Sequence, residues 1–75
     1  MNYRDERKSL RFTFDPEADA SYLYLTNEGT AASQTVIDTD HGMVILDHDK
    51  HGRILGIEIL GATAMLPEEW GLTQQ

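Results

Sequence analysis

The feature that most constrains this chain is the alternation of five short apolar segments with short runs of turn-forming residues. The segments span residues 10–14, 21–26, 31–37, 43–46 and 53–60. Their length and their content of Val, Ile, Leu, Tyr and Phe are typical of β-strands. Parallel strands need a crossover of about a dozen residues or more, and no connection between these segments is that long. The sequence therefore predicts a mainly β fold, a single antiparallel sheet of about five strands.

The residues after the last segment have the pattern of short helical turns at 62–66 and 67–70. Glu68 and Glu69 follow Pro67, and acidic side chains in a first turn complement the helix dipole. Trp70 is then expected to dock this C-terminal helical element on the sheet. The fold class becomes β-rich α+β.

The chain has 75 residues, which is enough for one domain. Residues 1–9 carry five charges and little apolar surface, so they are predicted to form a flexible tail. Residues 10–70 form the predicted domain, and residues 71–75 a C-terminal tail. No Cys is present, so disulfides do not stabilise the fold.

The segments at 21–26, 43–46 and 53–60 are apolar on both sides of a strand. One short helix can cover only one face of such a sheet. The other face must meet a partner, and a second copy of the chain is the simplest one. We therefore expect a homo-oligomer, most simply a homodimer.

The 13 acidic and 6 basic residues give a net charge of −7. Such a chain repels phosphate backbones, so we expect no nucleic-acid partner and favour a basic protein instead. No apolar run approaches ~20 residues, so no membrane partner is expected. The missing secretory signal and the missing Cys predict a cytoplasmic location.

The first candidate binding residues are Asp15, Glu17 and Asp19, three carboxylates in one turn. Asp15 is also a good capping residue in front of Pro16, which explains the turn without chemistry. Both interpretations remain open.

Glu58 is the fourth candidate binding residue, because it interrupts an apolar segment. It either points to solvent or pairs with a cation such as Arg11 or Arg53, and the structural pairing is the favoured interpretation.

A metal site is the weaker hypothesis, with Asp47, His48, Asp49 and His51 as candidate ligands. Their spacing approaches that of an EF-hand loop, but a His replaces an oxygen ligand and the flanking segments are strands. Two His residues make a weak zinc site. The favoured interpretation is an exposed hairpin loop, and no cofactor is expected.

Nothing in the sequence indicates an enzyme. There is no Gly-x-Ser-x-Gly elbow and no glycine-rich phosphate loop. A domain of this size has no room to enclose a typical ligand pocket beside a core. Gly56, alone inside an apolar segment, predicts a bulge or close backbone packing.

The stretch FDPEADASYLYL resembles the opening of the DUF2283 family, small bacterial and archaeal proteins of unknown function. The other pieces that carry the resemblance are residues 42–47 and the ending GRILGIEIL at 52–60. Ser21 stands where the family usually has an aromatic or aliphatic residue. The resemblance covers residues 10–62 and implies a compact, mostly β fold without established catalytic residues. It also implies, for some members, pairing with a small toxin-like protein.

Two hypotheses follow for the function. The first is a non-enzymatic protein-interaction module that forms a homo-oligomer and is the acidic partner of a small basic, toxin-like protein. The alternative is a protein that binds a small ligand or a divalent metal, using the DPEAD turn at 15–19 or the loop at 47–51.

Overall fold

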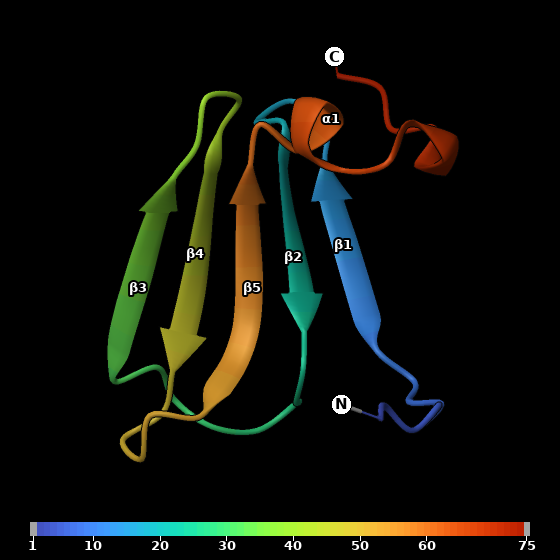
Figure 1. The fold of residues 1–75 in the computed structure, drawn as a ribbon. Helices are drawn as coiled ribbons and strands as arrows, with labels where there is room; N and C mark the ends of the chain where they lie inside the picture. The colour runs from blue at the N-terminus through green and yellow to red at the C-terminus, as the bar shows by residue number, and fades with distance from the viewer. Residues whose placement is uncertain (1, 75) are drawn as a thin grey trace.

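A computed structural model describes residues 2–74 and contains one five-stranded antiparallel sheet (Figure 1). The strands are β1 (Arg11–Asp15), β2 (Ala20–Tyr24), β3 (Ser33–Asp38), β4 (Met43–His48) and β5 (Ile54–Leu60). A short helix α1 (Ala62–Met65) and a 3-10 turn η1 (Glu68–Trp70) follow. The predicted fold class is confirmed, with strand boundaries that differ by a few residues.

The strands lie in the order β1-β2-β5-β4-β3, and every neighbouring pair is antiparallel. The last strand is therefore inserted at the centre of the sheet. The chain leaves β2 and crosses one end of the sheet to reach β3 at the far edge (Figure 1). β5 comes from the longest apolar segment. Because β5 lies between β2 and β4, the backbone groups on both of its edges form hydrogen bonds with a neighbouring strand.

One correction concerns Asp47 and His48, which were predicted to begin a hairpin loop. Both belong to β4, because pairing with Ser33 and Gln34 of β3 continues the strand to His48. In a strand, consecutive side chains point to opposite faces. Asp47 and His48 are thus placed on different sides of the sheet.

The strand registers define two faces, because opposed residues of an antiparallel pair share a face. We name one the tyrosine face. Its three rows, from β1 to β3, are Arg11, Tyr24, Gly56, Asp47 and Gln34; Thr13, Tyr22, Glu58, Ile45 and Val36; and Asp15, Ala20, Leu60, Met43 and Asp38.

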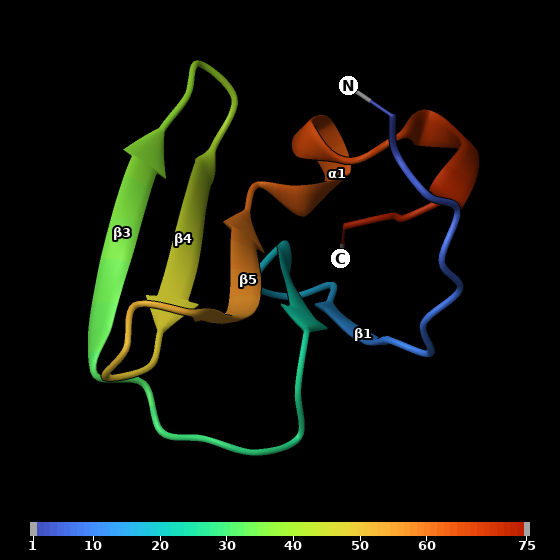
Figure 2. The same cartoon turned by 60° about the horizontal axis from the view of Figure 1, so that its bottom comes forward.

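We name the opposite side the phenylalanine face. Its two rows are Phe12, Leu23, Ile57, Leu46 and Thr35; and Phe14, Ser21, Ile59, Val44 and Ile37. The C-terminal element docks there: the ring of Trp70 meets that of Phe12 edge-on, with centroids 5.2 Å apart. The predicted docking of Trp70 is confirmed. Figure 2 shows α1 on one side of the sheet and the connection between β2 and β3 on the other.

Burial in this fold is incomplete. Within residues 2–74, only Ser21, Gly56 and Ala62 are buried, and no large side chain is fully buried. The accessible surface is 6019 Å², against about 4,700 Å² for a folded monomer of this mass. Residues 2–10, which are exposed and form no helix or strand, contribute to the excess. The chain folds into a sheet but does not close a core around it.

Candidate functional site

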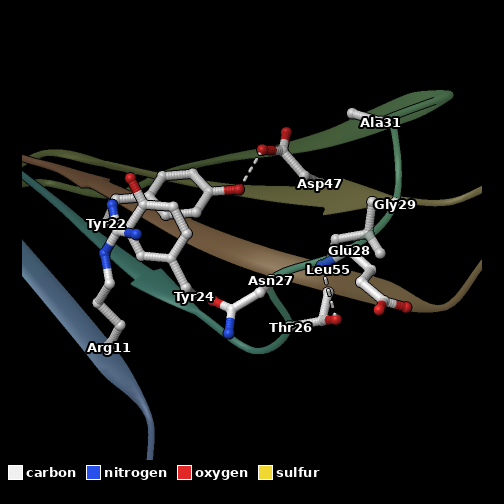
Figure 3. A pocket seen from close by; sticks show the side chains of 10 residues that line it. All are labelled: Arg11, Tyr22, Tyr24, Thr26, Asn27, Glu28, Gly29, Ala31, Asp47 and Leu55. Atoms are coloured by element: carbon white, nitrogen blue, oxygen red, sulfur yellow. Dashed lines mark hydrogen bonds between the residues drawn. The ribbon is translucent and has the colours of Figure 1, made fainter.

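An open groove of about 680 Å³ lies on the tyrosine face (Figure 3). The sheet contributes Arg11, Tyr22, Tyr24, Asp47 and Leu55 to its lining. The connection after β2 contributes residues 26–29 and Ala31. The expectation that a domain of this size leaves no room for a ligand pocket assumed a complete core. This chain has an open groove in place of an enclosed pocket and buries fewer side chains.

Asp47 organises the groove. The hydroxyl of Tyr22 donates a hydrogen bond to Oδ2 of Asp47 at 2.5 Å, and Nε2 of Gln34 donates to Oδ1 at 2.8 Å. One carboxylate thereby links β2, β3 and β4. The hydrogen bond to Asp47 raises the pKa of Tyr22 to about 12, because ionised Tyr22 would lose its donated proton beside a carboxylate.

The positive charge of the groove comes from Arg11, which lies over the ring of the second tyrosine, Tyr24. The guanidinium carbon of Arg11 lies 4.0 Å from the ring centroid of Tyr24, a cation–π arrangement. The rings of Tyr22 and Tyr24 lie 4.6 Å apart at 52°. Arg11 takes part in none of the ion pairs found between residues 2 and 74. Its charge is therefore available to a bound molecule.

A bulge in β5 shapes the groove. The register steps from Gly56 opposite Asp47 to Ile54 opposite His48, which leaves Leu55 as an extra residue. Leu55 then lines the groove close to Gly29 (Figure 3). A Cβ on Gly56 would overlap the ring of Tyr22. Gly56 thus lets this ring lie across the sheet and reach Asp47, and the predicted bulge is confirmed.

The sequence model of one family, described as protein of unknown function (DUF2283), matches residues 11–62. The chain belongs to the DUF2283 family. No curated protein and no solved structure matches it. The DUF2283 match runs from the start of β1 to the first residue of α1, so it contains every residue that lines the groove.

In this DUF2283 chain, the DPEAD turn is a clasp between two parts of the fold. Oδ1 of Asp15 accepts a hydrogen bond from the backbone N–H of Glu17 at 3.0 Å, as expected for a capping residue. Asp19, at a positive φ of 51°, accepts hydrogen bonds from the backbone N–H and the hydroxyl of Thr63 at 2.9 and 3.0 Å. Its carbonyl oxygen also accepts from the N–H groups of Gly61 and Ala62, each at 2.9 Å.

Both aspartates of the turn therefore have partners inside the DUF2283 fold, while Glu17 is exposed. A binding role for Asp15, Glu17 or Asp19 stays a prediction. The clasp explains why a carboxylate is needed at position 19, where it caps the first turn of α1 from another part of the chain.

The predicted pairing of Glu58 with Arg11 or Arg53 is wrong. The ion pairs between residues 2 and 74 all lie in the N-terminal segment. Glu58 stands at the centre of the tyrosine face, between Tyr22 and Ile45. Arg11 instead lies over Tyr24. Glu58 and Asp15 also line a second, smaller hollow on this face.

The candidate metal ligands diverge. Asp47 faces the groove, whereas the ring nitrogens of His48 lie 2.8 Å from Oγ1 of Thr35 and 3.2 Å from the carbonyl oxygen of Gly52. Asp49 accepts hydrogen bonds from the N–H groups of Arg53 and His51, which lower its pKa. Across residues 2–74, no three His, Asp or Glu side chains meet in a cluster that could hold a metal ion.

The same range includes no helix long and apolar enough to cross a membrane.

Sequence reasoning missed Arg11, Tyr22, Tyr24 and Gln34 as site residues. The only local signal was the spacing of two between the tyrosines, which puts both rings on one face of a strand. Their convergence with Asp47 depends on strands that are distant in the sequence.

Proposed function

We propose that this chain is a non-enzymatic protein-interaction module that self-associates and binds a small basic, toxin-like protein through its tyrosine face. The observation that carries the proposal is the composition of that face. Strand register places four carboxylates on it, those of Asp15, Asp38, Asp47 and Glu58, and one cation, Arg11.

The groove has the residue types that dominate the energy of protein interfaces. Tyr and Arg are enriched among interface hot spots. Tyr22 is already held by Asp47, so little side-chain entropy is lost when a partner binds. The net charge of −7 accelerates encounters with a basic protein and disfavours acidic ones.

Small-ligand binding is the second candidate. One observation favours it: the groove volume of about 680 Å³ lies within the range of about 300–1,000 Å³ that small-molecule sites occupy. Such a ligand would contact Tyr22, Tyr24 and Asp47, not the DPEAD turn.

The test is affinity capture from a lysate of the source organism, with quantitative protein identification, using the wild-type chain, Tyr24→Ala and Tyr3→Ala. Tyr3 is 87% exposed in the N-terminal segment, so Tyr3→Ala is a matched control for the same chemical change. We expect one basic protein in stoichiometric amount with the wild type and with Tyr3→Ala. Tyr24→Ala should weaken its binding by about 30-fold, the loss expected for a hot-spot residue.

Two results would contradict the proposal. One is a basic protein that Tyr24→Ala captures as well as the wild type does. The other is recovery of the bare chain with a bound small molecule, seen by native mass spectrometry and lost in Tyr24→Ala. The second result would establish the small-ligand alternative.

A further inference from the structure

β3 is an edge strand with an unprotected outer side. It pairs only with β4, and all six of its residues are exposed. Val36 is 52% exposed on the tyrosine face and Ile37 is 45% exposed on the phenylalanine face. Natural edge strands are usually blocked by Lys, Pro or a bulge. β3 has none of these, and its only charge is Asp38 at its end.

The phase of the β3–β4 ladder shows which backbone groups point outward. The N–H of Thr39 donates to the carbonyl oxygen of Gly42 at 2.9 Å, so residues 39 and 42 form a hydrogen-bonded pair. Hydrogen-bonded pairs alternate along an antiparallel ladder. Residues 33, 35 and 37 therefore direct their backbone groups to β4. Gln34, Val36 and Asp38 direct theirs away from the sheet.

We propose that β3 of one copy pairs antiparallel with β3 of a second copy, about a twofold axis at Val36. The two sheets then form one continuous ten-stranded sheet. This inference rests on the self-association in the proposed function and specifies the surface that performs it. With Val36 opposite Val36, Gln34 lies opposite Asp38, and the outward N–H and C=O groups of all three residues find partners.

The charge pattern of the edge selects this register. Asp38 meets the uncharged amide of Gln34 and not a second Asp38, so no like charges are opposed. A register centred on Thr35 would place Asp38 opposite Ala32. The N–H of Ala32 already donates to the carbonyl oxygen of His48 at 2.8 Å. The Val36 register is therefore the one that pairs every outward group.

The surface of one copy is largely uncovered. Its accessible area of 6019 Å² exceeds the value for a compact monomer by about 1,300 Å², and the exposed residues 2–10 contribute only part of this excess. The other edge strand, β1, already has a packing partner on its phenylalanine face, where Phe12 contacts Trp70 of the C-terminal segment.

A twofold axis perpendicular to the sheet keeps both tyrosine faces on one side. The dimer would then present two grooves in the same direction. Two linked sites raise the apparent affinity for a partner that can reach both.

Disulfide trapping tests the register, since the chain has no native Cys. Opposed residues of a hydrogen-bonded antiparallel pair have Cα atoms about 5.5 Å apart, within reach of a disulfide. Val36→Cys should become a covalent dimer under mild oxidation. Ile37→Cys is the control: it is nearly as exposed, but the two copies of residue 37 would lie about 8 Å apart, too far to bridge.

A second variant tests the edge itself. Val36→Pro removes an outward N–H, and Pro is tolerated on edge strands at such positions. The Val36→Pro variant should sediment as a monomer, and its circular dichroism should show that the sheet is intact. The Val36→Thr variant should stay dimeric. A wild type that stays monomeric across a hundredfold range of concentration, or a dimeric Val36→Pro variant, would overturn the inference.

The outcomes separate this inference from the proposed function. A wild-type dimer in which Ile37→Cys traps and Val36→Cys does not would overturn the β3 register and leave self-association standing. A Val36→Cys dimer that captures no basic protein would support the register and remove the proposed partner.

Discussion

At the scale of single residues, the contact between Tyr22 and Asp47 has a measurable signature. Replacing Asp47 by Asn removes the carboxylate that raises the pKa of Tyr22 to about 12, so this pKa should fall toward its ordinary value of 10.0. Ultraviolet titration of tyrosinate measures it. Tyr22→Phe should abolish the late-titrating step, and Tyr24→Phe should retain it. An unchanged titration in Asp47→Asn would show that the contact is absent in solution.

The same contact makes folding stability depend on pH. The pKa of Tyr22 is higher in the folded chain than in the unfolded chain, so its protonated form favours folding. This contribution is fully present below pH 10 and is lost as the pH rises through about 12. Wild-type stability should therefore fall more steeply over that window than the stability of Asp47→Asn.

At the scale of elements, the Asp19 clasp joins the turn after β1 to the start of α1. Asp19→Ala leaves the N–H and hydroxyl of Thr63 without their acceptors. It should lower the free energy of unfolding by about 1–2 kcal/mol. Urea unfolding at fixed protein concentration measures the loss.

Two further variants sharpen that test. Asp19→Asn should lose less, because Asn tolerates the positive φ and keeps one acceptor oxygen. Glu17→Ala, in the same turn but exposed, should change stability by less than about 0.5 kcal/mol. Equal losses in Asp19→Ala and Glu17→Ala would mean that the clasp contributes nothing.

At the scale of the whole molecule, incomplete burial couples folding to association. Residues 2–74 contain no fully buried large side chain, so the fold gains stability when a second copy covers its surface. The midpoint of thermal unfolding should therefore rise with protein concentration in the wild type. It should be independent of concentration in Val36→Pro. A wild-type midpoint that does not move over a hundredfold range of concentration would argue against a dimer.

Several features of the fold could be predicted from the sequence because they depend on local pattern. Apolar segments of strand length and short connections predicted the antiparallel sheet, and the lone Gly56 in a strand predicted the bulge, which the structure places at the neighbouring Leu55. Trp70 is the only aromatic side chain of residues 62–70, and it docks on Phe12 as expected.

The errors arose where local pattern is ambiguous. Asp47 and His48 resemble loop residues, but pairing with β3 makes them strand residues. For Glu58, which interrupts an apolar segment, pairing with a cation was favoured over pointing to solvent. In the structure, Glu58 lies beside Tyr22 on the tyrosine face and is only partly buried.

Local pattern and composition were enough to predict most of each strand, the capping role of Asp15 and the acidic charge, because each depends on neighbouring residues or on residue counts. The strand order and the registers could be found only in the folded chain, because they depend on pairing between distant segments. The groove is a product of those registers: Tyr22, Gln34 and Asp47 meet across three strands. The outward phase of β3 has the same origin, since it is set by its pairing with β4.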